Sequence, residues 1–157
     1  MISLGIDPGT TRIGYGVIKN ERNRLTCIAY GIISNPGTDK FADYVDTEKQ
    51  LAAIIEQYQP DVAGIEKLFF FKNQKTVMAV SEMRGVLMLT LAKHRIPVQE
   101  FTPPQVKQNI SAYGKADKEQ VQRMVRMLLG IKERITPDDA ADALALAICC
   151  ASNIIPK

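Results

Sequence analysis

The chain of 157 residues has few of the residues that build disulfide frameworks, zinc sites or membrane spans. Its three cysteines include an adjacent pair, Cys149 and Cys150, and this spacing matches neither a disulfide framework nor a zinc site. We therefore expect the cysteines to be small buried apolar groups in a reducing cytoplasm. The longest apolar run, near residues 140–151, is broken by Asp142, so we expect no membrane span. The N-terminus has no basic region followed by a long apolar core, so we expect no export signal of that kind.

The chain also lacks a strong excess of charge of either sign. It has 20 lysine and arginine residues against 17 aspartates and glutamates, a formal net charge of +3. That excess is too small to establish a nucleic-acid partner, although the isoelectric point of about 8.8 is compatible with one. With 46% apolar residues and no repeat, low-complexity segment or linker, residues 1–157 are expected to form a single domain with its own core.

Alternating apolar residues predict strands near the start of the chain. Residues 2–7 and 13–17 alternate apolar side chains with smaller ones on either side of a Pro-Gly turn, which is typical of a hairpin. Residues 24–33 predict a third strand, which ends at a run of turn-forming residues. Further strands are expected over residues 61–66 and 96–101, and helices over residues 44–58, 74–95, 103 onward, 117–129 and 136 onward.

The last of these helices has a recognisable start. Thr136 and Pro137 suit its N-cap and its first helical position, respectively. Because three strands come first and the later strands return through helices, we expect an α/β fold with a mixed five-stranded sheet flanked by helices.

The helix expected over residues 74–95 is apolar on nearly all sides. Val80 and Met83 lie on one broad arc, whereas Met78 and Leu89 lie toward the other side. A helix that is apolar all round is usually buried on two sides. This helix could therefore form a subunit interface or be sandwiched within one domain, and the sequence leaves both open.

Four acidic residues stand at positions where chemistry is expected. Asp7 and Glu66 end two predicted strands, and Asp139 and Asp142 share one face of the last helix through i,i+3 spacing. Asp7 alone fits an ordinary role as a hydrogen-bond acceptor in a turn. Asp142 does not fit such a role, because it lies among alanines and leucines. Desolvating an unpaired carboxylate there costs on the order of several kcal/mol. If the first and fourth strands are neighbours, all four acids could converge.

Four carboxylates in one pocket repel each other and raise each other's pKa unless cations are present. Ligation by oxygen alone selects Mg²⁺ or Mn²⁺ over zinc. Two such ions, about 3.5–4 Å apart, would activate a water and stabilise the leaving oxygen of a phosphodiester. The simpler alternative for Asp138 and Asp139 is that both acids favour the positive end of the helix macrodipole.

Four segments make the chain resemble a known family. They are GIDPGTTRIGYGV (residues 5–17), GIEKLFFFKN (64–73), FTPPQVKQ (101–108) and PDDAADALALA (137–147). In this order they resemble the RuvC family of crossover junction endodeoxyribonucleases, the bacterial Holliday junction resolvases. The resemblance runs nearly end to end and implies a ribonuclease-H-like fold, a homodimer and a branch-migration motor as partner. It also implies Mg²⁺-dependent, paired symmetric nicking of four-way DNA junctions during recombination and repair.

The resemblance also implies which residues act. The catalytic and metal-binding acids fall on Asp7, Glu66, Asp139 and Asp142, with two Mg²⁺ ions per active site, which Mn²⁺ could replace. Asp138 directly precedes this pattern. We place the ligand at Asp139 because it lies i,i+3 from Asp142, whereas the i,i+4 spacing of Asp138 makes it the less suitable substitute.

Candidate DNA contacts lie outside the acids. Lys118 begins a basic stripe with Gln122 and Arg126, and such a stripe is usually a solvated helix face. The resemblance instead implies that Lys107 and Lys118 contact phosphates, which would make DNA binding salt-dependent. It gives Phe69 a stacking or wedging role at the junction centre, although core packing could absorb one or two of the phenylalanines at 69–71.

Two other functions fit part of the sequence. The segment GID-x-GTT also resembles the phosphate-binding loop of actin-like ATPases and sugar kinases. Those folds need a duplicated domain and a later glycine-rich nucleotide loop, which 157 residues do not supply. The other alternative is a module that binds junctions without cutting them, and the intact acids argue against it.

Overall fold

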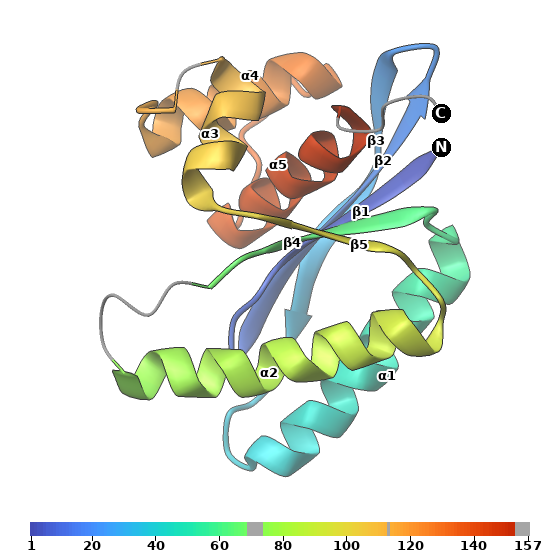
Figure 1. Cartoon of the computed structure of the whole chain (residues 1–157), viewed down its shortest axis with the longest axis vertical. Coiled ribbons are helices and arrows are strands. Elements are labelled where there is room, and N and C mark those ends of the chain that lie inside the picture. Colours follow the sequence, from blue (N-terminus) through green and yellow to red (C-terminus); the bar gives the residue numbers. More distant parts are fainter. Residues whose placement is uncertain (69–73, 113, 153–157) are drawn as a thin grey trace.

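The strands form where the sequence alternates apolar with small or polar residues, and they assemble into one mixed sheet (Figure 1). The computed structural model describes residues 1–68, 74–112 and 114–152. Its strands are β1 Ile2–Asp7, β2 Arg12–Glu21, β3 Arg24–Ser34, β4 Val62–Glu66 and β5 Val98–Phe101, in the sheet order β3-β2-β1-β4-β5. β1 is antiparallel to β2 and parallel to β4, and β4 is parallel to β5. The predicted mixed five-stranded sheet is therefore confirmed.

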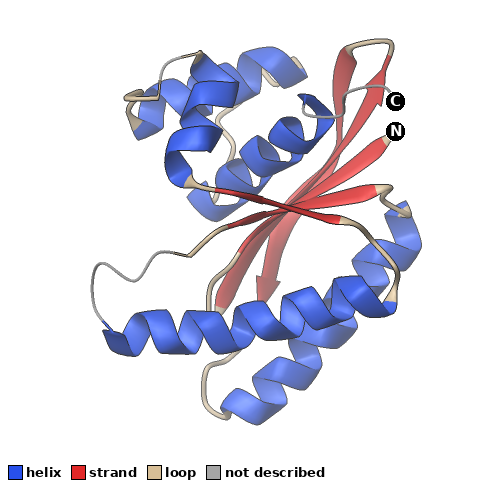
Figure 2. Ribbon diagram, viewed as in Figure 1, coloured by secondary structure: helices blue, strands red, loops and turns tan. Residues whose placement is uncertain are grey.

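Helices cover both faces of this sheet (Figure 2). One face carries α1 Lys40–Tyr58 and α2 Gln74–Lys93, and the other carries α3 Pro103–Ser111, α4 Lys118–Leu129 and α5 Asp138–Ser152. Because successive strand residues point to opposite faces, two hydrophobic clusters form. Among the helices of the described residues, none combines the length and apolar character that a membrane crossing requires.

α5 lies very close to β1 and β2 because the residues at the contact are small. A Cβ on Gly5 would come well under 3.0 Å from the carbonyl oxygen of Ala143. A Cβ on Gly14 would also come well under 3.0 Å from the carbonyl oxygen of Asp139. Glycines on the strands and alanines on the helix thus bring the acidic face of α5 to the ends of the strands.

The predicted start of the last helix is wrong. α5 begins at Asp138, after the two residues expected to cap and open it. The Pro137 carbonyl accepts a hydrogen bond from the Ala140 N–H at 3.1 Å, so Pro137 belongs to the turn that precedes the helix. Thr136 is therefore not the N-cap.

The first helix starts earlier than its apolar spacing predicts. Asp39 is its N-cap, and the carboxylate accepts hydrogen bonds from the N–H groups of Phe41 and Ala42 at 2.9 and 3.3 Å. This cap satisfies backbone donors of the first turn and extends α1 back to Lys40.

α2 buries only one side within the described part of the chain. Met83, Leu87 and Leu91 pack in the cluster shared with α1, whereas Met78 and Leu89 are each 62% exposed. The helix is therefore not sandwiched within the described residues. Its role as a subunit interface stays a prediction.

Candidate active site

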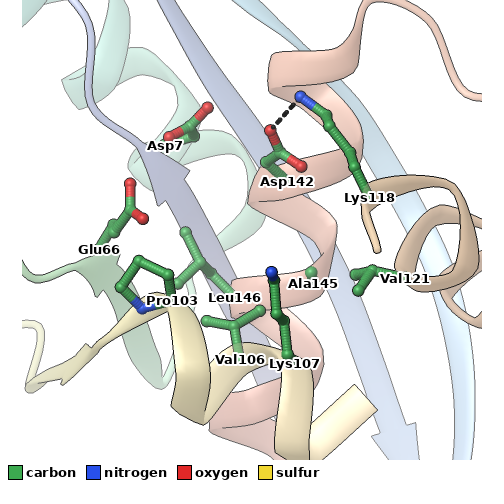
Figure 3. A pocket seen from close by; sticks show the side chains of 10 residues that line it. All are labelled: Asp7, Glu66, Pro103, Val106, Lys107, Lys118, Val121, Asp142, Ala145 and Leu146. Atoms are coloured by element: carbon green, nitrogen blue, oxygen red, sulfur yellow. Dashed lines mark hydrogen bonds and ion pairs between the residues drawn. The ribbon is translucent and has the colours of Figure 1, made fainter. Parts of the chain in front are cut away.

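Parallel pairing of β1 and β4 places two acids at the same edge of the sheet. Ile6 pairs with Ile65, so Asp7 and Glu66 follow side by side at the carboxyl ends of their strands. Asp142 approaches them from α5, and Figure 3 shows the three carboxylates around one space. This is a cavity of about 280 Å³, lined by Asp7, Glu66, Pro103, Val106, Lys107, Lys118, Val121, Asp142, Ala145 and Leu146.

The fourth predicted acid lies beside this cavity and does not line it. Asp139 is one helical turn before Asp142, and its carboxylate forms an ion pair with the Arg12 guanidinium at 3.1 Å. The sequence reasoning missed Arg12, although it belongs to the same opening motif as Asp7. The signal available in the sequence was a basic residue a few positions after the acid that ends the first strand.

Crowding and burial make these carboxyls hold their protons tightly. Burial, followed by the charges of Asp142, Glu66 and Asp139, raises the pKa of Asp7 to about 8. Burial and then Asp142 raise the pKa of Glu66. Burial raises the pKa of Asp142 as well, even though the Lys118 ammonium opposes the shift. Near neutral pH, added positive charge would therefore favour the fully ionised form of these acids.

The donor set suits a hard divalent cation, since Asp7, Glu66 and Asp142 offer only carboxylate oxygens. The positions of these side chains are less suitable for metal binding. Among residues 1–68, 74–112 and 114–152, no group of three or more histidine, cysteine, aspartate or glutamate side chains is arranged so that it could hold a metal ion. Shared ligation of one ion would require these side chains to turn toward one another.

Two lysines of the predicted DNA-contact set also line the cavity. Lys107 comes from α3 and Lys118 from the start of α4 (Figure 3). The Lys118 ammonium lies 3.2 Å from a carboxylate oxygen of Asp142 and 3.6 Å from one of Asp138. Lys118 is therefore paired with acids of α5 and is more than a solubilising surface charge.

The rest of the predicted basic stripe is also engaged. The Gln122 amide donates to a carboxylate oxygen of Asp138 at 3.0 Å. The Arg126 guanidinium donates to the carbonyl oxygen of Lys132. Phe69, the remaining predicted DNA contact, lies outside the described residues.

Comparisons with known proteins point in one direction. The model of the family described as "Crossover junction endodeoxyribonuclease RuvC" matches residues 3–150. The chain is 47% identical over 150 residues to the crossover junction endodeoxyribonuclease RuvC of Petrotoga mobilis, covering 95% of this chain and 92% of the relative. It is 46% identical over 155 residues to the protein of the same name from Heliobacterium modesticaldum, covering 98% and 96%.

Solved structures agree with these matches. The structure of T. thermophilus RuvC in complex with a Holliday junction substrate superposes with a TM-score of 0.90 at 29% identity, covering 96% of this chain and 93% of that chain. The yeast mitochondrial Holliday junction resolvase Ydc2 superposes with a TM-score of 0.65 at 16% identity, covering 94% and 77%, which supports the fold alone. The expected ribonuclease-H-like fold is thereby confirmed.

Proposed function

The chain belongs to the RuvC family of crossover junction endodeoxyribonucleases, and on this premise we propose that it resolves four-way DNA junctions by paired, symmetric, Mg²⁺-dependent nicks. The observation that carries the proposal is one cavity that holds three carboxylates from separate elements and two lysines. Acids supply ligands for a cation, and lysines supply partners for the phosphate of a scissile strand.

Asp7, Glu66 and Asp142 would hold Mg²⁺, and Asp139 would complete the set, with two ions per active site and Mn²⁺ as a substitute. When bound, the metal would activate a water and stabilise the leaving oxygen of the phosphodiester. Burial and then the neighbouring acids raise the pKa of Asp7, and this supports the assignment because a bound divalent cation would stabilise the ionised carboxylate. Asp139 would have to leave its ion pair with Arg12 to serve as a ligand.

Lys107 and Lys118 line the cavity from two different helices, so a phosphate held in the cavity would lie near both. The lysines would hold and orient the strand and offset its charge beside the carboxylates. We give Phe69 the stacking role at the junction centre.

Paired nicks require two sites, and we propose that a homodimer provides them through the uncovered side of α2. Met78 and Leu89 are exposed there, and a Cβ on Gly85 would meet no atom within 4 Å. A glycine inside a helix costs about 1 kcal/mol relative to alanine, so an open glycine between exposed apolar residues favours close approach of a second helix. We further propose that the dimer works in the cytoplasm with a branch-migration motor.

This dimer has a direct test. Gly85→Leu should shift the protein toward monomer in light scattering coupled to size exclusion, because the added side chain holds the partner helix away. Gly85→Ala is the matched control and should remain dimeric with an unchanged or higher melting temperature. Equal masses for the parent and both variants would show that α2 does not form the dimer interface.

The activity is tested with a labelled four-way junction and a linear duplex of the same sequence. The protein with Mg²⁺ should cut two strands of like polarity in the junction, leave the duplex intact, and lose activity on chelation. Binding without cutting at any Mg²⁺ or Mn²⁺ concentration would favour a junction-binding module. Unselective cutting of both substrates would contradict the proposed specificity.

A further inference from the structure

The acids of α5 carry positive partners supplied by the protein itself, whereas the acids of the strand ends do not. Arg12 pairs with Asp139 at 3.1 Å, and Lys118 pairs with Asp142 at 3.2 Å. Among the described residues, no ion pair is formed by Asp7 or Glu66. Part of the negative charge of the site is thus already compensated on the helix side.

Lys118 lies between two carboxylates that differ in position. Asp142, at 3.2 Å, lines the cavity, and Asp138, at 3.6 Å, does not. The other oxygen of Asp138 accepts a hydrogen bond from Gln122 at 3.0 Å and lies 3.8 Å from the Arg134 guanidinium. Asp138 therefore lies outside the cavity, with both oxygens facing cationic or donor groups of the protein.

We propose that Asp138 is a positioning residue, which takes over the Lys118 ammonium when a divalent cation binds Asp142. The inference rests on the proposed function, which places a metal ion at Asp142. A metal ion and an ammonium compete for the same carboxylate oxygen and repel each other at close range. Lys118 is already within ion-pair distance of Asp138, so it can leave Asp142 without losing its last acidic partner. Asp138 thereby eases metal entry and keeps the lysine beside the cavity.

This role also distinguishes Asp138 from Asp139, which is the proposed metal ligand. A ligand must direct a free oxygen into the cavity, and the oxygens of Asp138 are directed at Lys118, Gln122 and Arg134. Its effect on metal binding should therefore pass through Lys118. A residue that acts in this way leaves a thermodynamic signature, because its substitution should lose its effect once Lys118 is gone.

The test measures Mn²⁺ affinity of the DNA-free protein by electron paramagnetic resonance of the free ion. Lys118→Met should tighten binding by about two- to fivefold, the range expected for removing one solvent-exposed ion pair. Lys107→Met is the matched control, because it removes a cation of the same cavity that forms no ion pair among the described residues, and its effect should be smaller. Asp138→Asn should weaken binding by about two- to fivefold in the parent and have no effect in the Lys118→Met background.

Two further variants complete the design. Asp138→Glu keeps the acidic acceptor and should restore the parent affinity, and Glu119→Gln removes a nearby exposed charge and should change little. Equal weakening by Asp138→Asn in both backgrounds would overturn the inference, since Asp138 would then act on the metal directly. Failure of the parent and of Lys118→Met to bind any Mn²⁺ would instead overturn the proposed metal site, and the inference with it.

Discussion

Replacing Asp7 by asparagine should stabilise the metal-free protein, and the gain should grow with pH. Asp7 ionises near its ordinary pKa of 3.8 in the unfolded chain, but its pKa in the folded protein is about 8. Between these values the folded state holds a proton that the unfolded state has released. The parent therefore loses stability as the pH rises through this window, and above it the loss is complete. Asparagine cannot ionise and escapes this loss.

The size of the effect follows from the same two values. A tenfold change in proton affinity corresponds to about 1.4 kcal/mol, so the full penalty for ionised Asp7 is on the order of 6 kcal/mol. Water reaches the partly exposed carboxyl, and the neighbouring acids share the adjustment, which reduces the penalty. We expect Asp7→Asn to gain roughly 2–3 kcal/mol more at pH 8 than at pH 5.

Urea unfolding with EDTA present, at several pH values from about 5 to 8, measures the difference directly. A pH-independent difference, or a loss of stability in Asp7→Asn, would refute the reasoning and make Asp7 a structural acceptor of the turn. Added Mg²⁺ should reverse the order, because only the parent retains the full set of ligands and gains stability from binding.

Other substitutions test separate parts of the molecule. Glu66→Gln and Asp142→Asn should each abolish junction cutting while junction binding in a gel shift is kept; cutting at the parent rate would exclude that acid from the site. Lys118→Ala should weaken junction binding and reduce the slope of log affinity against log salt by about 0.9, the change expected when one phosphate contact is lost. An unchanged slope would show that Lys118 forms ion pairs with the acids of α5 but contacts no phosphate. Gly5→Ala should cost about 3 kcal/mol in a urea melt, because its Cβ would overlap the Ala143 carbonyl oxygen; near-parent stability would show that α5 can shift away from β1.

The sequence by itself determined the elements and the kind of chemistry. Alternation of apolar residues predicts the strands because side chains of a strand point to opposite faces, and the sheet follows that pattern. Asp7 and Glu66 were identifiable as candidate site residues because each ends an apolar strand, and the structure places both in one cavity. Asp142 was identifiable as a third candidate because a carboxylate in an alanine-rich, buried helix is costly to desolvate without a partner. These signals are local, so a single chain carries them.

Tertiary structure alone decided how the charges are distributed around the site. Helical spacing places Asp139 and Asp142 on one face of α5, but it does not reveal that Arg12 of β2 pairs with the first and Lys118 of α4 with the second. Helical spacing also left undecided whether Asp138 assists or replaces Asp139. In the structure, α4 packs beside α5, and Asp138 lies outside the cavity next to Lys118. Ion pairs between distant segments depend on how the elements pack, and a spacing within one helix contains no information about the neighbour that it meets.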